Sequence, residues 1–160
     1  MSEPEADRTG TTLYMERRFG APRDAVFAAW TDPEQVKQWF RPPDTTTPSA
    51  EMDVRVGGQY RFTVQSRNAV VHLVGTYLEV EPPERLVYTF RWDPPTLDLM
   101  DTGETQVTVE FRDLGSETEV VLIHEKLRDV EVRDFHEFGW TNILDRMAEL
   151  LASKPLGEVS

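Results

Sequence analysis

The sequence predicts an α+β fold, in which a curved antiparallel sheet of about six to seven strands packs against one long C-terminal helix. Most of the chain consists of segments that alternate apolar and polar residues, such as 59–65, where Tyr60, Phe62 and Val64 share one face. Residues 130–152 instead show a helical period, with Trp140 and Ile143 on one apolar face. A single amphipathic helix after a run of strands needs a sheet to cover it, so the two elements are expected to share one core.

The N-terminal half begins with a strand and a bent pair of short helices. Residues 11–19 form the predicted first strand, and a helix is expected to start just after Pro22 and to end near Trp30. Asp32 is a suitable N-cap for a second helix, and Pro33 fits its first turn. The sequence Arg-Pro-Pro at 41–43 should stop that helix, because proline restricts both itself and the residue before it.

Short turns separate the remaining predicted strands, which should therefore pair as antiparallel neighbours. Gly57 and Gly58 form one such turn. Gly75 lies inside a strand that is apolar on both faces, so it suggests a bulge or bend, and the inner face of that strand stays open. The predicted strands are 49–56, 59–65, 70–80, 85–92, 104–112 and 117–126.

Composition restricts the classes of partner. The 160 residues predict a single domain over 11–152 between a disordered tail at 1–10 and a C-terminal tail at 153–160. The net charge of −12 and the lack of a basic run argue against a nucleic-acid or anionic-lipid partner. No segment reaches the roughly 18 apolar residues of a membrane span. The absence of cysteine excludes disulfides, and the polar N-terminus does not resemble a secretory signal, so a cytoplasmic location is expected.

Four motifs, in order, resemble a known family. They are AWTDPEQVKQWF at 29–40, DVRVGGQYRF at 53–62, GTYLEVEPPERLVYTF at 75–90 and HEFGW at 136–140. Together they resemble the activator of heat-shock-protein-90 ATPase homologue family, within the START-like, Bet v 1-like (SRPBCC) superfamily. The resemblance spans about residues 14–151, and the turn at 66–69 departs from the family pattern because it lacks the glycine often found there.

This resemblance implies a helix-grip fold, in which the sheet grips the C-terminal helix around an elongated cavity. Superfamily members bind apolar molecules in that cavity, and a minority are cyclases, aromatases or hydroxylase components. The family name comes from a co-chaperone, so a chaperone partner is a further implication. Fold alone does not establish function, and the site residues have to be argued separately.

Aromatic side chains are the main candidates for the cavity wall. The inner faces of two strands carry several of them, and the bent helices are expected to close one end of the cavity. Ordinary core packing is the alternative explanation for the same pattern. The aromatic candidates are Trp30, Trp39, Phe40, Tyr60, Phe62, Tyr88, Phe90 and Trp92. Leu97, Leu99 and Met100 in the loop at 96–103 either fold over something apolar or pack on strand ends.

The C-terminal helix supplies a second group of candidates. Phe135, Phe138, Gly139 and Asn142 share a helical face, with Asn142 as a polar anchor or as a solvent-facing residue. Gly139 costs about 1 kcal/mol relative to alanine, so it should allow either close packing or cavity volume. His124 is the histidine expected to face the cavity. The three histidines lack metal-ligand spacing, so no metal site and no cofactor are expected.

Three functions remain open at this point. Binding of a small apolar or amphipathic molecule in the internal cavity is the leading hypothesis. The first alternative is an enzyme on a bulky apolar substrate, resembling a polyketide cyclase or aromatase, with His124 and Tyr88 as the residues to test. No catalytic motif is recognisable in the chain. The second alternative is a co-chaperone-like interaction module, and the sequence leaves the oligomeric state open.

Overall fold

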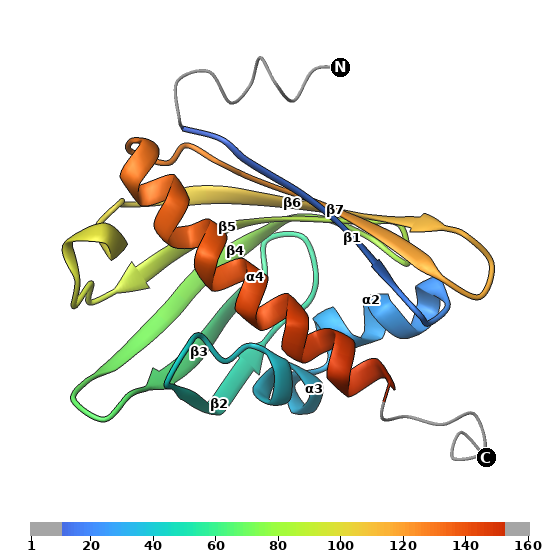
Figure 1. Cartoon of the computed structure of the whole chain (residues 1–160), viewed down its shortest axis with the longest axis horizontal. Coiled ribbons are helices and arrows are strands. Elements are labelled where there is room, and N and C mark those ends of the chain that lie inside the picture. Colours follow the sequence, from blue (N-terminus) through green and yellow to red (C-terminus); the bar gives the residue numbers. More distant parts are fainter. Residues whose placement is uncertain (1–10, 153–160) are drawn as a thin grey trace.

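A seven-stranded antiparallel sheet forms one layer of the molecule, in the order β1-β7-β6-β5-β4-β3-β2 (Figure 1). The computed structural model describes residues 11–152, so the predicted tails at 1–10 and 153–160 lie outside the described residues. The strands are β1 (Leu13–Phe19), β2 (Thr46–Met52), β3 (Gln59–Gln65), β4 (Val70–Glu81), β5 (Arg85–Asp93), β6 (Thr105–Asp113) and β7 (Thr118–Glu125).

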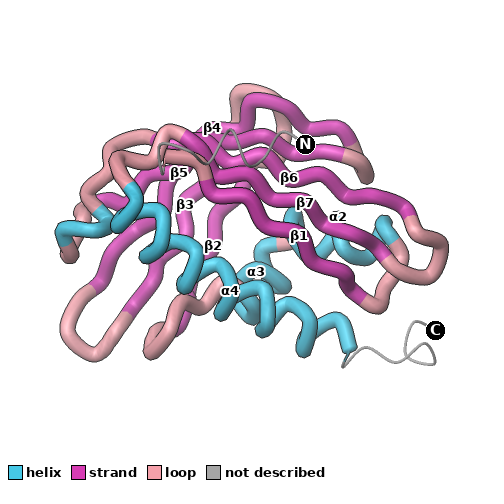
Figure 2. Tube along the Cα trace, turned by 45° about the horizontal axis from the view of Figure 1, so that its top comes forward, coloured by secondary structure: helices cyan, strands magenta, loops and turns pink. Residues whose placement is uncertain are grey.

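The helices lie together on one side of the curved sheet, and the longest of them runs across its concave face (Figure 2). They are α2 (Arg23–Thr31), α3 (Pro33–Trp39) and α4 (Val130–Ala152), with a short 3₁₀ helix, η1 (Asp98–Met100), between β5 and β6. This arrangement confirms the predicted helix-grip fold, including the two short helices after the first strand. No helix in the described part of the chain is long and apolar enough to cross a membrane.

The bend between α2 and α3 is held by local hydrogen bonds. Asp32 has an extended backbone, and its side chain accepts a hydrogen bond from the amide of Glu34 at 3.0 Å. This confirms the predicted N-cap, and Pro33 occupies the first turn, where no intrahelical donor is lost. The indole of Trp39 donates to the carbonyl of Ala29 at 2.8 Å, which ties the two helices together.

Strand β2 differs from its predicted range of 49–56. It begins at Thr46 and ends at Met52, and its pairing with β3 is irregular between Thr46 and Ser49. Pro48 lies in that irregular stretch, where a missing backbone N–H is tolerated because β2 is an edge strand. The sequence signal was misleading because proline, threonine and serine suggest a loop.

The inner face of β4 is identified by its buried residues. Val71, Leu73 and Tyr77 point into the core, and Leu78 is exposed on the opposite face. A register shift between Tyr77 and Glu79 then brings Val80 back against the core. The bulge therefore lies beyond Gly75, although Gly75 itself is required for a close approach between strands. A Cβ there would lie 1.9 Å from the carbonyl oxygen of Thr89 on β5, which no side chain can accommodate.

Candidate functional site

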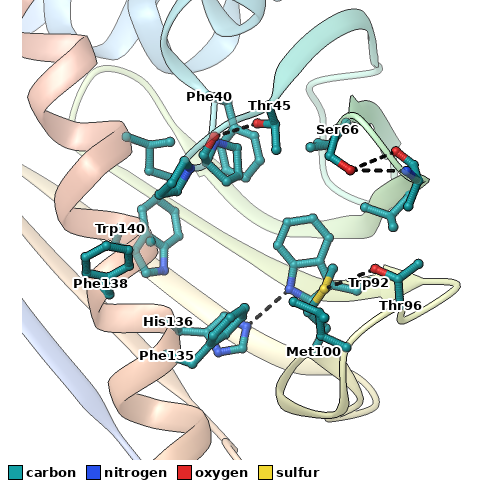
Figure 3. Close-up of a pocket in the computed structure, with 18 of the residues that line it drawn as sticks. Phe40, Thr45, Ser66, Trp92, Thr96, Met100, Phe135, His136, Phe138 and Trp140 are labelled. Carbon is teal, nitrogen blue, oxygen red and sulfur yellow. Dashed lines mark hydrogen bonds between the residues drawn. The ribbon is translucent and has the colours of Figure 1, made fainter.

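An apolar pocket of about 300 Å³ opens at one end of the fold, beside the N-terminal half of α4 (Figure 3). This volume lies at the lower end of the range for small-molecule sites. The walls come from α4, the segment after α3, the β3–β4 hairpin, the end of β5 and the β5–β6 loop. The lining residues are Phe40, Pro42, Pro43, Thr45, Val64, Ser66, Ala69, Val71, Phe90, Trp92, Thr96, Leu97, Met100, Phe135, His136, Phe138, Gly139, Trp140 and Ile143.

Aromatic rings form the deep end of this pocket. Phe90 and Trp92 from β5 meet edge to face, with ring centroids 5.5 Å apart. Phe40 approaches Trp92 at 6.5 Å and Trp140 of α4 at 6.3 Å. These spacings are typical of favourable aromatic pairs, so the rings pack against one another as well as forming an apolar wall. The predicted candidates Phe40, Phe90 and Trp92 therefore lie together at the pocket.

Two large apolar side chains at the pocket remain open to solvent. Leu97 in the β5–β6 loop is 55% exposed, and Phe138 on α4 is 64% exposed. Met100 from the same loop is buried against the pocket. The loop therefore combines the two alternatives that its composition suggested, because Leu97 and Met100 line the pocket while Leu99 and Met100 also pack on the core. Phe135, another predicted candidate, is half-buried in the wall.

Gly139 makes room for the pocket. It lies on α4 one turn after Phe135 and one turn before Ile143, and all three residues line the space. A Cβ added at Gly139 would have no heavy atom within 4 Å. Close packing on a strand therefore does not account for this helical glycine, and a side chain here would meet open space beside the other lining residues.

His136 is the one titratable side chain among the lining residues, and both of its ring nitrogens are engaged. The indole N–H of Trp92 donates to Nε2 at 3.2 Å, so the proton is assigned to Nδ1, which donates to the carbonyl of Val132 at 2.8 Å. Burial lowers the pKa of His136, and the bond to Val132 only partly opposes this shift. His136 therefore serves as a neutral part of the wall.

His124 lies next to the pocket but does not line it. Trp140 donates its indole N–H to Nδ1 at 3.1 Å, and Nε2 lies 2.8 Å from the hydroxyl of Thr105. Thr105 in turn donates to the carbonyl of Phe90 at 2.8 Å, so Nε2 of His124 must carry the proton. Burial, together with the nearby His136, lowers the pKa of His124 far below its ordinary value. No nitrogen of His124 is left to orient a ligand.

Five of the predicted aromatic candidates belong to the packed core instead. They surround a void of only about 10 Å³ near α2 and α3, which is about the least that can hold one water molecule. The indole of Trp30 donates to the hydroxyl of Tyr88 at 3.3 Å, and burial raises the pKa of that phenol. The five are Trp30, Trp39, Tyr60, Phe62 and Tyr88.

Asn142 also lies outside the pocket. Its side-chain amide donates to the carbonyl of Phe138, one turn earlier on α4, at 2.8 Å. The other three predicted helix candidates, Phe135, Phe138 and Gly139, do line the pocket, and a second row of lining residues runs through His136, Trp140 and Ile143. This second row could have been found from the sequence, because its residues are spaced at i, i+4 and i+7.

The remaining lining residues supply little reactive chemistry. The pocket wall contains no carboxylate, lysine or arginine side chain. Within residues 11–152, no group of three or more His, Asp or Glu side chains is arranged to hold a metal ion. The arrangement is suited to enclosing an apolar molecule, since its few polar groups already bond to the protein.

Several solved structures share this architecture. A protein from Chromobacterium violaceum is 26% identical, with a TM-score of 0.76 over 88% of this chain and 96% of that one. The AHSA1 protein of Silicibacter pomeroyi is also 26% identical, with a TM-score of 0.76 over 90% of this chain and 99% of that one. A Rhodobacter sphaeroides protein, at 22% identity and a TM-score of 0.77 over 92% and 96% of the two chains, supports the fold alone.

The search of functionally curated proteins found no match. The model of the family described as Activator of Hsp90 ATPase homolog 1-like protein matches residues 20–152, and the chain belongs to this family.

Proposed function

We propose that this protein binds a small apolar or amphipathic molecule in the pocket between the end of the sheet and the N-terminal half of α4. The observation that carries the proposal is Gly139. Gly139 lines the pocket from a helix interior, where glycine is less favourable than every other residue except proline, and a side chain at this position would meet open space. Glycine at this position lowers the stability of the helix, and no close packing compensates for that cost. We infer that the compensation is the open pocket.

The state of the polar groups supports binding over catalysis. His136 and Trp92 bond to each other, and the hydroxyl of Thr45 donates to the carbonyl of Pro42 at 2.6 Å. A ligand in the pocket therefore meets an apolar surface without leaving these groups unpaired. The residues that an enzyme mechanism would have used, His124 and Tyr88, lie in the adjacent core.

The test is a titration with N-phenylnaphthylamine, a neutral apolar dye whose fluorescence rises when it leaves water. The wild-type protein should bind the dye. Gly139→Leu should weaken dye binding by about tenfold or more, because the new side chain fills a pocket of this small size. The same substitution should raise the free energy of unfolding by about 0.5–1 kcal/mol, because leucine is a better helix former than glycine.

Two variants serve as controls. Glu149→Leu adds the same side chain at an exposed position of α4 outside the pocket, so dye binding should stay at the wild-type level. Gly139→Ala should stabilise the helix while leaving most of the pocket open. The proposal fails if the wild-type protein does not bind the dye. It also fails if Gly139→Leu binds the dye as well as Glu149→Leu does.

A further inference from the structure

A polar recess adjoins the apolar pocket on the side of the β3–β4 hairpin. It has a volume of about 440 Å³, and Thr45 and Ser66 line both the recess and the pocket, so the two spaces adjoin at these residues. Figure 3 shows Thr45 and Ser66 on the side of the pocket opposite Met100 and Phe135. The recess is lined by Arg41, Asp44, Thr45, Thr46, Gln65, Ser66, Arg67 and Arg146.

The charge of this recess is opposite to that of the whole chain. Three arginines, Arg41, Arg67 and Arg146, face one carboxylate, Asp44, whereas the chain has a net charge of −12. Within residues 11–152, none of the three guanidinium groups forms an ion pair with a carboxylate. A local excess of positive charge on an acidic protein attracts an anion to this point of the surface.

Hydrogen-bond donors in the recess are also in excess. Arg146 uses its Nε to donate to the carbonyl of Arg41 at 3.1 Å, which fixes its side chain across the recess. The Nε of Arg41 is buried without an acceptor. The hydroxyls of Thr45 and Ser66 donate to the carbonyls of Pro42 and Ala69, so arginine provides the donors that face a ligand.

We propose that the ligand is an amphiphile with an anionic oxygen group, a carboxylate or a phosphate, held by the arginines of the recess while its apolar part occupies the pocket. The inference rests on the proposed function, because the pocket must bind the apolar part. Guanidinium groups suit such a head because they bond carboxylate and phosphate oxygens in pairs. The anionic group of the ligand would pass from the pocket into the recess beside Thr45 and Ser66, which line both spaces.

The test uses competition against N-phenylnaphthylamine by three compounds with the same ten-carbon chain: decanoate, decyl phosphate and decanol. At low salt, both anions should displace the dye from the wild-type protein at about tenfold lower concentrations than decanol does. Comparison of decanoate with decyl phosphate identifies which anionic group the recess prefers. Raising the salt concentration should weaken the anions and leave decanol unchanged, because salt screens charge.

The variant Arg67→Gln/Arg146→Gln should lose most of the advantage of the anions while retaining dye and decanol binding. Arg18→Gln removes the same kind of charge from an exposed position on β1, at the far edge of the sheet, and should behave as the wild type. The salt dependence of the wild type provides a second measurement that does not depend on the folding of the variant.

The outcomes separate the two proposals. If the dye binds in the pocket but the three compounds displace it equally well, the proposal of an anionic head group is wrong. The proposal that the pocket binds an apolar molecule is then retained. The same conclusion follows if the double variant retains the full preference for anions. If neither the dye nor any of the three compounds binds, both proposals fall.

Discussion

At the scale of single residues, the core beside the pocket depends on a chain of buried hydrogen bonds. Trp140 donates to His124, and His124 donates to Thr105, which itself donates to the carbonyl of Phe90. Every member has a partner, so the polar groups can be buried without a large desolvation penalty. Removing one member leaves another without its partner.

We therefore expect His124→Leu to lower the free energy of unfolding by about 1–3 kcal/mol, because the indole N–H of Trp140 loses its acceptor in a dry interior. Urea unfolding measures this change. His72→Leu is the matched control, since His72 is only half-buried and contacts the hydroxyl of Thr63. It should change stability by about 0.5 kcal/mol or less. Equal losses in the two variants would contradict the assigned network.

The residue scale is also where the sequence was least informative. Alternation correctly predicted that Tyr60, Phe62, Tyr88, Phe90 and Trp92 would point inward. It could not divide them between packed core and pocket, because that depends on how α2 and α3 fill the space. His124 and Asn142 lie outside the pocket. Both ring nitrogens of His124 and the side-chain amide nitrogen of Asn142 bond within the protein, and such partners cannot be read from a single sequence.

At the scale of elements, the local signals were more reliable. The cap of α3 required only Asp32 and the two residues after it, and the structure has the predicted bond. The helical period of α4 likewise gave its full length from Val130 to Ala152. Strand β2 was less predictable, since its place at the edge depends on pairing with β3 rather than on its own residues. The register shift of β4 was hidden for the same reason.

The cap gives a prediction for α3. Asp32→Ala should lower the free energy of unfolding by about 1 kcal/mol, because the amide of Glu34 loses the acceptor that caps the helix. Asp32→Asn should retain most of the stability, since asparagine is an equally good N-cap. Thermal or urea unfolding of the two variants measures the difference. A loss of the same size in both would mean that the charge of Asp32, and not its capping geometry, is what stabilises the helix.

At the scale of the whole molecule, the two buried histidines link stability to pH. Their ring centroids are 5.3 Å apart, and burial lowers the pKa of both His124 and His136. Below the unfolded pKa of about 6.5, the unfolded chain takes up protons that the native protein excludes. The stability that the two histidines contribute by staying neutral is therefore fully present above about pH 6.5. This contribution is lost progressively as the pH falls below that value.

A histidine that stays neutral in the native protein contributes a slope that is about 0.7 kcal/mol per pH unit at pH 6.5 and approaches about 1.4 kcal/mol per pH unit at lower pH. Urea unfolding at about pH 7 and about pH 5.5 measures the slope. In His124→Leu the slope should be smaller by about the contribution of one histidine, while the acidic residues contribute equally to both proteins. An unchanged slope in this variant would mean that His124 is protonated in the native state.

The order of the strands has a further consequence for how the chain is made. Within residues 11–152, the first strand, β1, pairs only with the last, β7, and Leu13 lies opposite His124. During synthesis, β1 must therefore leave the ribosome and remain without its sheet partner until nearly the whole domain has followed. Such a high contact order slows folding, because distant segments must meet before their contacts stabilise them. Until β7 has been made, β1 is therefore an unpaired strand, and unpaired strands in a nascent chain are prone to associate with other chains.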